Sequence, residues 1–240
     1  RTIFAPPPEP PPPPNRVLRV LIIGDPAADN PLPGAQKEAM LVRDLFEKFQ
    51  RLVNQAQDKK VGRVEIVALL GPTEATRTRV MQELILKSYD VLHYAGHCMY
   101  DKQKPSTSGW IFTGSKRLSA NELSRIDRIP KFVFSNACES GITPDRSEER
   151  SPELAPSFAE TFFARGVQNF VCTAWPVNDQ AALDFAARFY TGLLGLDGKD
   201  VEPMHVAMRE ARLTIYDKHY GIRTWGAYQH YGNPYFRLFR

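Results

Sequence analysis

Short apolar runs alternate along this chain with longer segments in which apolar residues recur at helical spacing. The short runs are rich in branched residues and end at turn-forming residues, which predicts strands, and the longer segments predict amphipathic helices. The expected strands are residues 17–23, 64–70, 90–95, 131–137 and 167–174, and the expected helices are residues 35–53, 73–87, 153–165, 180–194 and 202–218. Strands that alternate with helices form a mainly parallel sheet with helices on both faces. The chain is therefore predicted to fold as an α/β domain.

Smaller features add detail to this prediction. Residues 109–113 are apolar and predict a short extra strand. Thr73 is expected to cap the helix that it begins, and Ser119 with Glu122 has the spacing of a capping box. Residues 225–239 are expected to form a closing pair of strands around a turn.

The first residues of the chain differ in composition from the rest. Residues 6–14 are all proline except Glu9. Such a run favours polyproline II and cannot join the interior of a sheet, so it is either a docking motif or, as we favour, a stiff spacer. We therefore expect a proline-rich linker at residues 1–15, a single domain at residues 16–240, and an upstream sensor or repeat domain from which the linker separates it.

Charge and cysteine content exclude several classes of protein. The net charge is only +4 on 240 residues, and the basic residues are scattered among 27 acidic ones, which argues against a nucleic-acid partner. No apolar run approaches the roughly 18 residues of a membrane span. The three cysteines, Cys98, Cys138 and Cys172, form no CxxC pair and are expected to be free thiols in a cytoplasmic protein.

Two short strings follow two of the expected strands. His97 stands in Tyr94-Ala95-Gly96-His97-Cys98, and Cys138 stands in Ser135-Asn136-Ala137-Cys138-Glu139-Ser140-Gly141. The carboxyl ends of parallel strands meet at one edge of the sheet, so the imidazole and the thiol are expected to meet there. A neighbouring imidazole activates a thiol for attack on a carbonyl. We therefore expect a His97/Cys138 dyad in a cysteine protease, with Gly96 permitting a tight turn before the histidine.

Other interpretations of these residues remain open at this point. A lone cysteine after a strand is more often inert packing, and His93, inside its strand, is expected to be structural. Zinc binding by His97, Cys98 and Cys138 is disfavoured, because adjacent His-Cys is a poor chelating spacing and no fourth ligand is evident. We expect no metal and no cofactor.

Four strings in order resemble those of a CHAT domain. They are Gly96-His97-Cys98, the string around Cys138, residues 166–179 and residues 225–234, and the resemblance covers residues 17–239. CHAT domains are a caspase-like family related to separase and the caspases and often joined to tetratricopeptide repeats. The resemblance implies a caspase-like three-layer α/β/α sandwich of about six mostly parallel strands with a short antiparallel extension.

The resemblance also implies roles for single residues. His97 is the general base and acid, and Cys138 is the nucleophile. The oxyanion would lie between the backbone amides of Cys138 and Cys98, although the family usually has glycine at the second position. Asp179 would receive a basic P1 side chain, or it simply caps the helix that follows it. Glu139, directly after the nucleophile, would help to shape the pocket.

The expected function is limited, regulated proteolysis of a protein substrate in signalling, defence or cell death, with cleavage after Arg or Lys. The polar residues 143–151 are expected to form an exposed loop near the substrate cleft. One alternative is a catalytically inactive caspase-like docking module, which a thiol probe specific for Cys138 would distinguish. A second alternative is a flavodoxin-like binding domain, but the chain lacks a glycine-rich phosphate loop after its first strand.

Overall fold

The computed structural model describes residues 16–55, 62–99, 101, 103–104, 107–123, 125–139, 162–163, 166–218 and 224–239, with the backbone alone at Cys138 and Glu139. The strands are β1 (Val17–Gly24), β2 (Arg63–Leu70), β3 (Val91–Met99), β4 (Gly109–Phe112), β5 (Lys116–Ser119), β6 (Phe132–Glu139), β7 (Asn169–Thr173) and β8 (Tyr228–Gly232). The helices are α1 (Pro33–Gln55), α2 (Gly71–Glu74), α3 (Arg77–Leu86), α4 (Ala120–Leu123), α6 (Asp179–Leu194), α7 (Met204–Asp217), α8 (Thr224–Ala227) and the short 3₁₀ helix Thr113–Ser115. The expected loop at residues 143–151 and nearly all of the expected helix at residues 153–165 lie outside the described residues.

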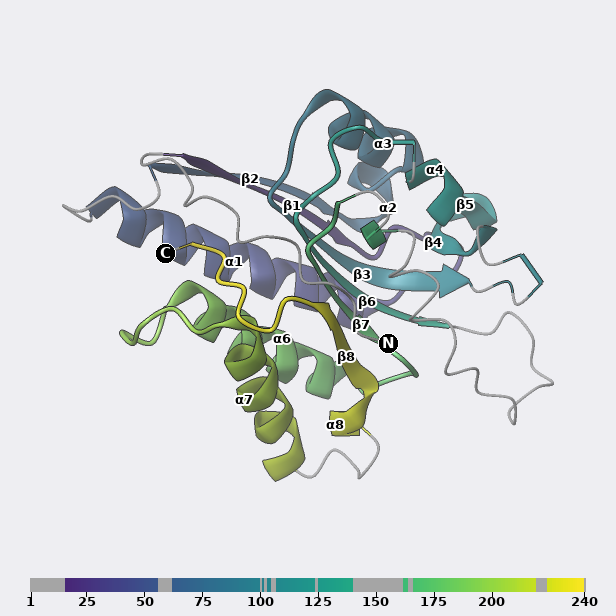
Figure 1. Cartoon of the computed structure of the whole chain (residues 1–240). Helices are drawn as coiled ribbons and strands as arrows, with labels where there is room; N and C mark the ends of the chain where they lie inside the picture. The colour runs from purple at the N-terminus through teal and green to yellow at the C-terminus, as the bar shows by residue number, and fades with distance from the viewer. Residues whose placement is uncertain are drawn as a thin grey trace.

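The strands form one sheet in the order β2-β1-β3-β6-β7-β8. The first five are parallel, β8 is antiparallel to β7, and the hairpin β4–β5 attaches to the end of β3. Helices cover both faces, with α1, α6 and α7 on one side and α3 and α4 on the other (Figure 1). The prediction of an α/β sandwich with a mostly parallel sheet is confirmed.

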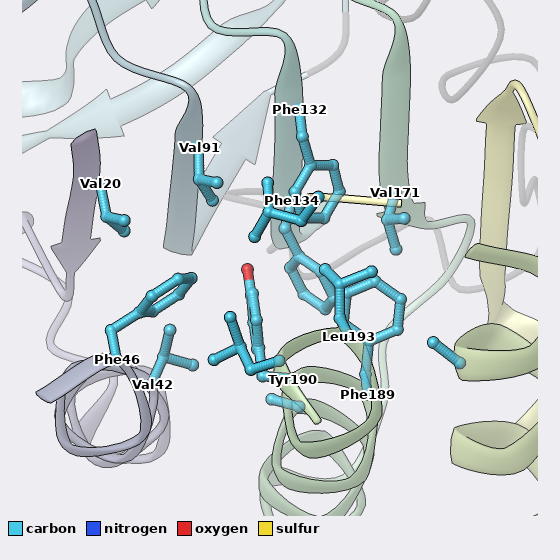
Figure 2. Packing of buried hydrophobic residues seen from close by; sticks show 14 of the residues in the cluster. Val20, Val42, Phe46, Val91, Phe132, Phe134, Val171, Phe189, Tyr190 and Leu193 are labelled. Carbon is cyan, nitrogen blue, oxygen red and sulfur yellow. The ribbon is translucent and has the colours of Figure 1, made fainter. Parts of the chain in front are cut away.

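Helix α1 shows how the sequence pattern becomes packing. Its buried positions recur every three or four residues, so they form one stripe along the helix. In Figure 2, Val42 and Phe46 of this stripe point toward the strands beside the side chains of α6. Burial of each such side chain contributes about 1.5–3 kcal/mol, which holds α1 firmly against the sheet.

Three local expectations differ from the structure. The cap of α3 is Thr76, whose side chain accepts a hydrogen bond from the Arg79 amide, while residues 71–74 form the separate short helix α2. Thr73 lies inside α2, so its predicted role as a cap is wrong. Residues 225–239 contain the single strand β8 rather than a strand pair, since β8 pairs with β7 and no second strand occurs among the described residues that follow it.

The capping box is confirmed. The Ser119 amide and hydroxyl both donate to Glu122, and the Glu122 amide donates back to the Ser119 hydroxyl at 3.3 Å.

Within the described part of the chain, no helix has the length and apolarity needed to cross a membrane.

Strands β3 and β6 are longer than expected. They pair in register as far as Cys98 and Glu139, and β4 adds a second partner to the end of β3. His97 and Cys138 therefore lie within strands rather than after them, because each strand end has a neighbour to pair with. The expectation of a tight turn before His97 is wrong.

Candidate functional site

His97 and Cys138 are direct neighbours across the sheet. Their Cα atoms are register partners in the parallel pair β3–β6, at the carboxyl edge of the sheet. Neighbouring strands are about 4.8 Å apart, and register partners in a parallel pair belong to the same face. The structure thus brings together the two residues that the sequence analysis singled out.

His97 is 4% exposed, and its imidazole has one hydrogen-bond partner among the described residues. Its Nε2 lies 2.8 Å from the backbone carbonyl oxygen of Asn30. A carbonyl oxygen only accepts, so Nε2 carries the proton in this arrangement. Among the residues that the structure describes, no hydrogen-bond partner reaches Nδ1, which is buried. The ring is therefore held in the tautomer in which Nδ1 can accept a proton.

The loop that presents the Asn30 carbonyl is anchored at several points. Asp25 has a positive φ of 48°, and its Oδ1 accepts a hydrogen bond of 2.8 Å from the Leu32 amide. The Asn30 amide donates to the Ala27 carbonyl. On the other side, Thr113 donates its amide to the Pro26 carbonyl. These bonds fix the oxygen that orients His97.

Gly96 is required by close packing rather than by a turn. A Cβ atom at this position would lie 2.8 Å from the Tyr94 hydroxyl oxygen and 2.9 Å from Pro26 Cδ. The Tyr94 hydroxyl points toward the His97 carbonyl at 2.7 Å and the Ile111 carbonyl at 3.2 Å. Glycine therefore leaves room for a tyrosine that ties the end of β3 to β4.

Cys98 belongs to the opposite face of the sheet. Its thiol donates to the Ala137 carbonyl at 3.2 Å, and its side chain packs in the cluster that contains Trp110. Cys98 also has a strand on each side, since it pairs with Glu139 in β6 and with Trp110 in β4. The Cys98 side chain thus lies away from the His97 face.

Asp179 is exposed and is the first residue of α6. The cap of this helix is Asn178, whose side chain accepts from the amides of Gln180 and Ala181, so the interpretation of Asp179 as the cap is wrong. The Asp179 carboxyl group packs over Gly34 of α1, where an added Cβ would lie 2.3 Å from Asp179 Cγ. Both residues line a surface depression of about 400 Å³, and Lys37 lines it as well.

A buried polar cluster lies near the carboxyl edge of the sheet and was missed by the sequence analysis. Glu38 of α1 is 1% exposed, and its Oε2 accepts a 2.5 Å hydrogen bond from Asn136 Nδ2. Glu38 Oε1 lies 3.3 Å from His93 Nε2, and His93 Nδ1 lies 3.1 Å from the Tyr190 hydroxyl. Burial and the Glu38 carboxylate raise the pKa of Tyr190 well above its usual range. His93 is therefore structural, as expected.

A signal for Glu38 did exist in the sequence. It stands four residues before Val42 and eight before Phe46, on the buried stripe of α1. A carboxylate on an apolar stripe needs a polar partner inside the protein.

The remaining cysteine contacts are simple. Cys98 and Cys172 are both buried, and burial raises the pKa of the Cys172 thiol to about 12. Over the residues that the structure describes, no group of three or more His, Cys, Asp and Glu side chains is placed to hold a metal ion.

Comparison with known families agrees with this geometry. The family model of the CHAT domain matches residues 4–233. The chain belongs to the CHAT domain family. The resemblance inferred from the four strings is thereby confirmed. Among curated proteins, no sequence matches this chain.

Solved structures similar to this CHAT domain are caspase-like cysteine proteases. The Arg-specific cysteine proteinase gingipain R has a TM-score of 0.56 at 12% identity, and the match covers 92% of this chain and 47% of that one. A complex of the Porphyromonas gingivalis RgpB pro- and mature domains gives the same TM-score, over 95% of this chain and 49% of that one. Separase from Saccharomyces cerevisiae, in a complex with securin, has a TM-score of 0.50 at 13% identity, over 92% of this chain and 12% of that one.

These matches establish a cysteine protease-like fold. The chain spans about half the length of the gingipain chains and about an eighth of the separase chain.

Proposed function

We propose that this CHAT domain is a cysteine endopeptidase in which His97 is the general base and Cys138 the nucleophile. The observation that carries the proposal is the register pairing of these two residues at the carboxyl edge of the sheet. The alternation of β6 puts position 138 on the same face as Asn136, which is the face of His93 and α1. No other pair of a histidine and a cysteine shares a register position in the described ladders.

The tautomer of His97 supports this assignment. With Nε2–H donated to the Asn30 carbonyl, Nδ1 is the atom that takes the proton from the Cys138 thiol. The thiolate attacks the scissile carbonyl carbon, and the protonated imidazole then gives its proton to the departing amine. Water hydrolyses the resulting thioester with the same imidazole as base, which restores the thiol.

The oxyanion would be stabilised by the backbone amides of Cys138 and Cys98. Cys98 has a strand on each side in the structure, and His97 is nearly buried. Access for a substrate therefore requires the ends of β3 and β6 to open. We propose that the isolated domain is latent and that an upstream sensor or repeat domain, or another regulatory partner, drives this opening.

We propose a preference for Arg or Lys at P1, with Asp179 as the acceptor. A carboxylate binds Arg through paired charge-assisted hydrogen bonds and Lys through a single charge. The exposure of Asp179 and its freedom from capping support this role, while Lys37 in the same depression competes for the carboxylate. Glu139, next to the nucleophile, would shape the rest of the pocket.

Three substitutions test this preference on a peptide library. Asp179→Asn should remove a basic preference. Gly34→Ala should weaken it as well, because the new methyl group displaces the carboxylate. Lys37→Met should strengthen it. A wild-type preference for Asp or an apolar residue at P1 would refute the assignment.

The family context supports limited proteolysis of a protein substrate, in signalling, defence or regulated cell death, as the biological role. The decisive experiment maps new protein N-termini generated by the wild type and by Cys138→Ala. His97→Ala and the double variant should be equally inactive, because the members of a dyad act as a unit.

A thiol probe should label Cys138 and spare Cys98 and Cys172, which are buried. Turnover by Cys138→Ala would refute the peptidase assignment. Probe labelling without turnover would favour an inactive docking module.

A further inference from the structure

The short segment between Asn30 and Glu38 contacts three residues in or beside the proposed site. Its first residue presents the carbonyl that binds His97 Nε2 at 2.8 Å. Gly34 lies against the carboxyl group of Asp179. Its last residue, Glu38, accepts the 2.5 Å hydrogen bond from Asn136. One continuous piece of chain therefore contacts the base, the proposed specificity residue and the strand that carries the nucleophile.

Asn136 is the nearest residue to Cys138 on its face of β6. The register pairs along β3 and β6 run from His93 with Phe134, through Ala95 with Asn136, to His97 with Cys138. Successive residues on one face of a strand are about 7 Å apart. The side-chain amide of Asn136, which Glu38 accepts from, therefore belongs to the residue two positions before the nucleophile on the same face of β6. Any shift of Asn136 moves the position of Cys138 relative to His97.

Glu38 is suited to prevent such a shift. It stands on the buried stripe of α1 between Gly34 and Val42, on a helix that packs against the sheet. Hydrogen bonds to a carboxylate are shorter and stronger than those to a neutral acceptor, and burial excludes competing water. Loss of the carboxylate would leave the Asn136 amide buried with only a 3.4 Å contact to the Tyr228 hydroxyl.

The other carboxylate oxygen of Glu38 lies next to His93, which in turn contacts Tyr190. His93 Nε2 approaches Glu38 Oε1 at 3.3 Å without the geometry of a hydrogen bond. The His93 ring is stacked on Phe134, and its Nδ1 is next to the Tyr190 hydroxyl of α6. The hydrogen bond from Asn136 therefore fixes Glu38, and His93 lies beside its second oxygen.

We propose that Glu38 is a positioning residue that sets the separation of His97 and Cys138. It touches neither the substrate nor the reacting atoms and acts through Asn136. The inference rests on the proposed dyad and adds to it a residue that ties helix α1 to the strand of the nucleophile.

The test measures the alkylation rate of Cys138 by iodoacetamide across pH, together with kcat and KM on a cleaved peptide. Glu38→Ala should lower the alkylation rate near neutral pH and kcat by about ten- to a hundredfold, with little change in KM, because a displacement of about 1 Å can cost this much. Glu38→Gln should restore most of both rates, since its amide oxygen can still accept from Asn136. Wild-type rates in Glu38→Ala, or failure of Glu38→Gln to restore them, would overturn the proposal.

Glu83 provides a matched control. It is a second buried glutamate on a helix, on the other face of the sheet, where it accepts a 2.5 Å hydrogen bond from the Tyr89 hydroxyl. Glu83→Ala should lower stability but leave the Cys138 alkylation rate unchanged. An equal loss of rate in both alanine variants would mean that Glu38 acts only through stability.

Two further variants keep the inference separate from the proposed function. In a His97→Ala background, the effect of Glu38→Ala on alkylation should disappear, because Glu38 acts through the dyad. If His97→Ala itself does not slow alkylation of Cys138, the dyad proposal fails instead. Should Glu38→Ala not fold, Asn136→Ala removes the donor and should reproduce the slow alkylation, and a wild-type rate there would contradict the inference.

Discussion

The environment of His230 makes this domain sensitive to acid. His230 lies on β8, and its Nε2–H donates to Asn169 Oδ1 at 2.9 Å. The guanidinium of Arg212 donates a hydrogen bond to the carbonyl of Tyr228, which lies in the same strand as His230. Burial, and then the charge of Arg212, lower the pKa of His230 from 6.5 to about 4. The folded protein therefore holds this imidazole neutral at a pH where the unfolded chain would protonate it.

The direction of the effect follows from proton binding. Well above pH 6.5 neither state binds the proton, and the group has almost no effect on the free energy of unfolding. As the pH falls from 6.5 toward 4, the unfolded state gains a proton that the folded state does not, so stability decreases. The gap between 6.5 and about 4 corresponds to a loss of at most about 3 kcal/mol, of which about 2 kcal/mol is reached by pH 5.

Urea unfolding of the wild type and of His230→Gln at pH 7.5 and pH 5.0 measures this loss. Glutamine can still donate to Asn169 but does not titrate, so the fall in stability between the two pH values should be about 2 kcal/mol smaller in the variant. His205→Gln, which replaces an exposed histidine, is the control. An equal fall with pH in the wild type and His230→Gln would refute the reasoning.

Further predictions concern stability and thiol chemistry. Gly96→Ala should destabilise the fold by about 1–3 kcal/mol in chemical denaturation, because its methyl group would meet the Tyr94 hydroxyl; wild-type stability would contradict the close packing. Thr76→Ala should lower the free energy of unfolding by about 1 kcal/mol, whereas Thr73→Ala should change it by less than about 0.5 kcal/mol; the reverse order would restore Thr73 as the cap. Cys172 should resist iodoacetamide at pH 8 in the folded protein and react once urea unfolds it, since burial raises its thiol pKa to about 12.

The order of strands and helices was predictable because it depends on local periodicity. The apolar positions of α1 and the branched runs of β1 and β2 fall where the sequence analysis placed them, to within about two residues. Errors occurred where the outcome depends on a distant partner. The extension of β3 to Met99 requires β6 and β4 beside it, and the single strand β8 requires β7.

The candidate site divides in the same way. The residue types of His97 and Cys138, and their places near the ends of two strands, are properties of the sequence, and so is the match to the CHAT family. Their register pairing is a property of the sheet. The face on which Cys98 lies is also a property of the sheet. Successive side chains of a strand point to opposite faces, so Cys98 and His97 lie on different faces.

The sequence by itself determined the fold class and the two residues most suited to chemistry, because periodicity and residue type act over a few neighbouring positions. Only the tertiary structure decided what surrounds them. The Asn30 carbonyl that orients His97 is 67 residues away in the chain, and the Glu38 carboxylate that holds Asn136 is 98 residues away. Contacts over such separations form when the whole sheet closes against α1, and no local pattern encodes which polar atoms then meet.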